Sequence, residues 1–106
     1  MIDARFDRVS LSLVMRGHAD HGRTPEGYDL VCCAASVLMY TLAYNAENSK
    51  LVDSVDTHFE PGDAFVTVCA SDGCHDRVLE KIEVILGGLE MLEKRYPECI
   101  RFRYVT

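Results

Sequence analysis

The sequence reads GHADHGRTPEGYDLVCCAAS from Gly17 to Ser36, and this stretch decides the fold. Residues of alternating polarity lead up to His18 and predict a strand, whereas the apolar and small residues after Asp29 predict a helix. Glycines and a proline between them mark a short loop. Cys32 is then expected in the first helical turn, where unpaired backbone N–H groups and the positive end of the helix dipole favour a thiolate. A thiol and an imidazole at opposite ends of one loop suit a nucleophile and its base.

The residues before this stretch predict two antiparallel strands. Ile2, Ala4 and Phe6 alternate with charged residues, and apolar residues repeat the same period of two from Leu11 to Met15.

Two helices are predicted, one on each side of a hairpin. The first runs from about Asp29 to Asn45 and carries apolar residues at helical spacing. The second runs from Asp76 to Arg95, where an apolar stripe is opposed by charged residues, and is the clearest helix in the sequence. Gly87-Gly88 inside it costs about 1 kcal/mol per glycine relative to alanine, so we expect close packing or a bend there.

The hairpin and a last strand complete the expected elements. Residues 51–59 and 64–70 are rich in Val, Thr and Phe, and Pro61 and Gly62 between them suit the central positions of a type II turn. Residues 100–105 alternate again. The order β-β-α-β-β-α-β predicts one α/β domain of the α+β kind over residues 1–106, in which an antiparallel or mixed sheet of about five strands packs with two main helices. The strand order stays open.

Composition limits the classes of function. The chain has 106 residues, enough for one domain, and a formal net charge of −6. This charge disfavours direct nucleic-acid binding and fits a basic peptide or protein partner. The longest apolar stretch, Leu30 to Tyr44, is too short to span a bilayer comfortably, and no targeting segment is recognised, so we expect a cytoplasmic protein. Five cysteines without a regular framework predict free thiols.

The central stretch resembles the ribosomal-processing cysteine protease family of bacteria. Its signature is Gly-His, a short loop, then Gly-x-Asp-x-Val-Cys-Ala-Ala-x-Ser, and the chain reads Gly17-His18, a slightly longer loop, then GYDLVCCAAS from Gly27. Cys33 stands where the family has alanine. The resemblance implies that His18 is the catalytic histidine and Cys32 the nucleophile. It also implies an endopeptidase, without a cofactor and able to form a homodimer, that removes a short N-terminal extension from large-subunit ribosomal protein twenty-seven.

The chemistry of such a site follows from the residue types. The Cys32 thiolate attacks a peptide carbonyl, and His18 deprotonates the thiol and later protonates the leaving amine. The free N–H groups at the helix start, from Asp29 to Cys33, are the expected oxyanion donors. Gly17, Asp29, Cys33 and Ser36 are therefore the candidate substrate-binding or oxyanion residues.

Several of these residues have a structural alternative. Asp29 also fits a helix N-cap, and if it accepts the N–H of Cys32, that group is lost to an oxyanion. Ser36 can bond back to the backbone instead of lining a pocket. Cys33 is rotated by about 100° from Cys32 and is expected in the core or as a bystander thiol. Cys32 could itself be a buried structural cysteine.

Other hypotheses concern the histidines, a metal and the loop. His18 could serve packing alone, and His21 is a weaker candidate for the base. No metal site is expected, because Cys69, Cys74 and His75 lack a paired Cys-x-x-Cys element. The loop from residue 19 to 28 is expected to act as a flexible lid.

The alternative function is a noncatalytic ribosome-associated module that holds a basic protein tail on its acidic surface.

Overall fold

The structure, a computed structural model, describes residues 1–27 and 29–105. The predicted order of elements is confirmed. The elements are β1 (Ile2–Asp7), β2 (Ser12–Arg16), α1 (Leu30–Glu47), β3 (Val52–Glu60), β4 (Asp63–Ala70), α2 (His75–Arg95) and β5 (Ile100–Tyr104).

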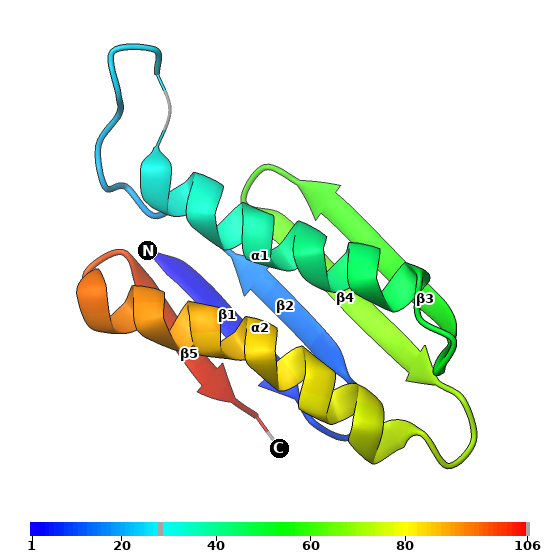
Figure 1. Cartoon of the computed structure of the whole chain (residues 1–106). Coiled ribbons are helices and arrows are strands. Elements are labelled where there is room, and N and C mark those ends of the chain that lie inside the picture. The colour runs from blue at the N-terminus through cyan, green and yellow to red at the C-terminus, as the bar shows by residue number, and fades with distance from the viewer. Residues whose placement is uncertain (28, 106) are drawn as a thin grey trace.

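The five strands form one mixed sheet in the order β3-β4-β2-β1-β5. β5 pairs parallel to β1, and the other neighbouring strands pair antiparallel. Both helices lie on the same face of this sheet, and the loop between β2 and α1 projects beyond the first turn of α1 (Figure 1). Because β4 pairs directly with β2, the turn that joins β3 to β4 lies at the end of β2 where that loop begins.

The core follows the periodicities in the sequence. Alternate residues of β1 and β2 are buried, among them Phe6 and Leu13, which are fully covered. Helix α1 buries Val31, Ala35 and Met39 at helical spacing. The matching stripe of α2 consists of Val78, Ile82, Leu86, Leu89 and Leu92.

Helix α1 is longer than the sequence predicted. It begins after the N-cap Asp29 and continues two residues beyond Asn45, to Glu47. The expectation that this segment is too short to span a bilayer is therefore wrong. By length and composition alone, α1 could cross one. Core helices of water-soluble proteins pass the same test, and α1 packs its buried residues on the sheet.

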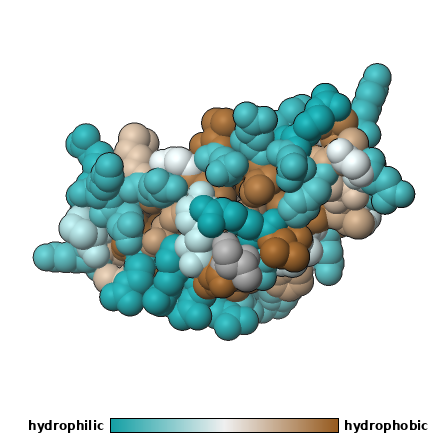
Figure 2. Space-filling model, turned by 90° about the horizontal axis from the view of Figure 1, so that it is seen from below, coloured by the Kyte–Doolittle hydropathy of each residue, from teal (hydrophilic) through white to brown (hydrophobic). Residues whose placement is uncertain are grey.

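The two glycines inside α2 differ in their surroundings. A Cβ at Gly88 would lie 2.8 Å from a methyl carbon of Leu38 on α1, whereas a Cβ at Gly87 would have no neighbour within 4 Å. The predicted close packing is therefore confirmed at Gly88, where the two helices approach. On the face shown in Figure 2, hydrophilic side chains cover most of the surface and hydrophobic atoms show between them in separate patches.

Candidate active site

Gly17 ends β2 and sets the direction of the chain into His18. Its φ of +95° is accessible to glycine at little cost, and a Cβ at this position would collide with the carbonyl oxygen of Met1. Its N–H donates to the carbonyl oxygen of Gly62 at 2.9 Å. Gly17 therefore fixes the backbone that carries His18, and its N–H is not free to bind an oxyanion.

Cys32 lies in the first turn of α1, as predicted, and is half-buried. The N–H of Ala19 donates to its Sγ at 3.2 Å. An N–H donor interacts more strongly with a thiolate than with a thiol. The residue that follows His18 thus contacts the sulfur directly, which brings the two ends of the loop together.

Asp29 is the N-cap of α1, and the capping interpretation is confirmed. Its Oδ1 accepts the N–H groups of Val31 at 3.0 Å and Cys32 at 3.1 Å, and its Oδ2 accepts the N–H of His21 at 2.8 Å. Burial raises the pKa of the Asp29 carboxyl, but the hydrogen bonds from Cys32, His21 and Val31 outweigh it and hold this pKa below its usual value.

This cap corrects one expectation about the site. The N–H groups of Val31 and Cys32 donate to the Asp29 carboxylate, and that of Cys33 donates to the Asp29 carbonyl oxygen at 3.0 Å. They were expected to be free oxyanion donors, and in this structure they are not. From the sequence, only the N–H of Cys32 was considered as a group that the Asp29 cap could occupy.

His18 and Cys32 line one cleft of about 320 Å³. Gly17 and Ser36 also line it, whereas Cys33 points elsewhere and is exposed. The remaining lining comes from β1, β2, α1 and the β3–β4 hairpin: Ile2, Met15, Ala35, Met39, Tyr40, Phe59, Glu60, Pro61, Gly62, Asp63 and Ala64. Of the four candidate substrate-binding or oxyanion residues, the cleft therefore contains Gly17 and Ser36.

Sequence reasoning missed the contribution of the β3–β4 hairpin to this cleft. Phe59 packs edge-on against Tyr40, with ring centroids 4.8 Å apart, and both rings line the cleft. Glu60 and Asp63, at the two ends of the turn, also line it. The Pro-Gly turn was visible in the sequence, but only the strand order shows that it lies beside His18.

The His18 ring is exposed and lies over Gly62. A Cβ at Gly62 would be only 2.7 Å from Nε2 of His18. No hydrogen bond joins the ring to Cys32 Sγ in this structure, in which both residues are described. Such contacts are often long in a free enzyme and tighten when substrate binds.

His21 lies away from the cleft. Its Nδ1 is 3.8 Å from Sγ of the buried Cys99, and its ring packs edge-on against Tyr96 with centroids 5.0 Å apart. These contacts, with the hydrogen bond to Asp29, tie the loop to α1 and to the end of α2. Opening and closing of this loop stays a prediction, and Tyr28 at its end lies outside the described residues.

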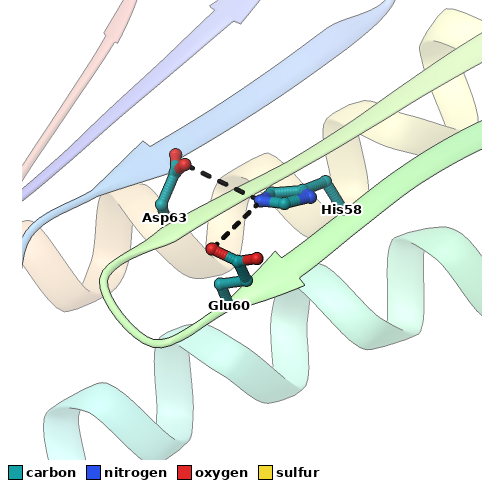
Figure 3. Close-up of side chains that lie close together, drawn as sticks. All are labelled: His58, Glu60 and Asp63. Carbon is teal, nitrogen blue, oxygen red and sulfur yellow. Dashed lines mark ion pairs between the residues drawn. The ribbon is translucent and has the colours of Figure 1, made fainter.

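One cluster of side chains on the β3–β4 hairpin has a spacing that could hold a metal ion. Nε2 of His58 lies 3.7 Å from a carboxylate oxygen of Glu60 and 3.7 Å from one of Asp63 (Figure 3). Both carboxylates are exposed, and ion pairing accounts for the arrangement. Within the described part of the chain, Cys69, Cys74 and His75 form no comparable group. All five cysteines are free in the structure.

The sequence of this chain is similar to those of cysteine proteases. The family model described as "Cysteine protease Prp" matches residues 1–101. Ribosomal processing cysteine protease Prp from two strains of Staphylococcus aureus is 28% identical over 92 residues, which is 87% of this chain and 84% of the relative.

Solved structures share the fold over nearly the whole chain. An S. aureus Prp, described as an essential ribosomal processing protease in complex with a covalently linked product peptide, superposes with a TM-score of 0.77 at 23% identity. The superposition covers 98% of this chain and 99% of that one. SMU.848 of Streptococcus mutans superposes with a TM-score of 0.73 at 26% identity, covering 98% and 93%.

Proposed function

Because the chain belongs to the cysteine protease Prp family, we propose that His18 and Cys32 are the catalytic dyad of its endopeptidase activity. One observation carries this assignment: both residues line the same cleft. The N–H of the residue after His18, which donates to Cys32 Sγ, supports it. The noncatalytic binding module is not retained, since the family is one of cysteine proteases.

The proposed reaction uses the sulfur and the imidazole in two steps. The Cys32 thiolate attacks the scissile carbonyl carbon, and His18, having taken the thiol proton, returns it to the leaving amine. Water then hydrolyses the thioester, with His18 as the base. Ser36 is one helical turn from Cys32 in the same cleft and supplies a hydroxyl for substrate binding.

We propose that the substrate is a large-subunit ribosomal protein twenty-seven that carries a short N-terminal extension. The S. aureus relatives are ribosomal processing proteases, and their solved structures hold a covalently linked product peptide or a substrate peptide. The net charge of −6 favours a basic protein of this kind. Because these relatives are bacterial ribosomal processing proteases, we also propose that this is a bacterial protein that acts in the cytoplasm.

A homodimer is part of the proposal. Leu30, Val37, Tyr40 and Tyr44 are exposed at a helical spacing along α1, and apolar surface of this kind is a frequent interface. Sedimentation velocity would detect the dimer, and a monomer at all concentrations would contradict it.

The substrate is tested by incubating the purified chain with the extended ribosomal protein and measuring intact masses. We expect a single cut that removes the extension. The His18→Ala variant should lose cleavage, whereas His21→Ala should retain most of it, because His21 lies outside the cleft. The reverse order of the two variants would move the base into the loop.

A further inference from the structure

The β3–β4 turn lies directly against the ring of His18. The position that a Cβ would occupy at Gly62 is 2.7 Å from Nε2 and 3.0 Å from Cε1 of that ring. We propose that Gly62 is a positioning residue for His18, whose missing side chain leaves the space in which the imidazole works. This inference rests on the proposed role of His18 as the base.

The backbone of the turn is suited to this role. Gly62 has a φ of +76°, which agrees with the predicted type II turn and disfavours any other residue. Its carbonyl oxygen accepts the N–H of Gly17, the residue before His18. β2 and β4 pair up to Arg16 and Asp63, whose side chains form an ion pair at 3.5 Å. The turn and the segment carrying His18 are therefore held together as one unit.

The hairpin is also braced on its outer side. His58 on β3 stacks on Phe65 of β4, with ring centroids 5.6 Å apart, and lies between Glu60 and Asp63 at the two ends of the turn (Figure 3). When protonated, His58 attracts both carboxylates. This cluster is therefore better explained as a brace for the turn than as a metal site.

A side chain at position 62 should disturb the imidazole and not the fold. Ordinary contact begins at about 3.4 Å, so the ring would have to move by about 0.7 Å. The atoms in the way belong to the end of a flexible side chain, and the ring can therefore give way while the backbone stays in place. Misplacement of a catalytic group by about 1 Å can lower the rate by about a hundredfold.

The test compares Gly62→Ala with a matched control, Gly73→Ala. Gly73 has nearly the same φ, +77°, but a Cβ there has no neighbour within 4 Å. Both variants therefore carry the same backbone strain, and only one displaces His18. We expect Gly62→Ala to lower kcat for an extended peptide by about tenfold or more. KM should stay within about twofold, and the pH profile of Cys32 alkylation should move towards that of His18→Ala. Gly73→Ala should have the kcat, the KM and the alkylation profile of the parent protein.

A second comparison separates this inference from the proposed dyad. In a His18→Ala background, adding Gly62→Ala should change neither the alkylation profile nor the melting temperature beyond the change seen with Gly73→Ala, because the ring is gone. Should Gly62→Ala alone fail to fold, the double variant should fold again. Full activity of Gly62→Ala, or equal effects with and without His18, would overturn the role of Gly62. Full activity of His18→Ala would instead overturn the dyad.

Discussion

At the scale of single residues, two adjacent thiols have different surroundings. Cys32 accepts an N–H from Ala19 and lines the cleft, whereas Cys33 is exposed and outside it. We therefore expect Cys32→Ala to abolish cleavage and Cys33→Ala to retain most of it. Initial rates on the extended ribosomal protein measure this, with circular dichroism to verify that both variants fold. Equal losses in two folded variants would refute the assignment.

Asp29 should stabilise the chain in a pH-dependent way. Its side chain accepts three backbone N–H groups, so Asp29→Ala should lower the free energy of unfolding by about 1 kcal/mol at pH 7. Asn is also a good N-cap, and Asp29→Asn should lose less.

The direction of the pH dependence follows from the lowered pKa of Asp29. A carboxyl whose pKa is lower in the folded state than in the unfolded state stabilises the fold fully above the unfolded value, about 3.9. That contribution is lost as the pH falls through the folded value. Urea unfolding of the parent and of Asp29→Asn should therefore show a stability difference that shrinks as the pH falls below 4. A constant difference would contradict this role.

At the scale of elements, periodicity predicted both helices and the strands β1, β2 and β5 because the core imposes it, whereas the β3–β4 hairpin was predicted from its Val, Thr and Phe content and its Pro-Gly turn. The alternation in β1 and the stripe of α2 have matching buried residues, such as Phe6 and Leu86. The strand order depends on contacts distant in sequence, such as that of Gly17 with Gly62, for which local patterns carry no signal. Cys32 was placed in its helical turn correctly because that position depends on local sequence. The hairpin side of the cleft was missed because it depends on contacts between segments distant in sequence.

The glycine pair in α2 provides a test of helix packing. Gly87→Ala should raise the free energy of unfolding by roughly 0.5–1 kcal/mol, because alanine favours the helix and the site is open. Gly88→Ala should gain less or lose stability, since its Cβ would lie 2.8 Å from Leu38. Denaturant unfolding measures the free energy of unfolding of both variants. Equal gains would mean that the helices do not approach at Gly88.

At the scale of the whole molecule, the effect of charge depends on distance from the cleft. The folded molecule extends 46 Å along its longest axis, whereas salt at 0.15 M screens interactions between exposed charges beyond about 8 Å. The net charge of −6 therefore acts on a substrate mainly through groups beside the cleft. Among these, Asp63 lies close to both Arg16 and His58, whereas Glu60 lies close to His58 alone and has a side chain that is 66% exposed.

We therefore expect Glu60 to determine much of the salt dependence of cleavage. Raising the salt concentration from 0.05 to 0.5 M should lower kcat/KM for the basic ribosomal protein by about tenfold and leave kcat nearly unchanged, because screening slows encounter and not chemistry. Glu60→Gln should flatten this dependence. Glu80→Gln removes the same charge from the N-terminal half of α2, at the other end of the molecule (Figure 1), and should leave the dependence as it is. If the two variants respond alike, the attraction comes from the net charge of the molecule, and Glu60 has no special part in it.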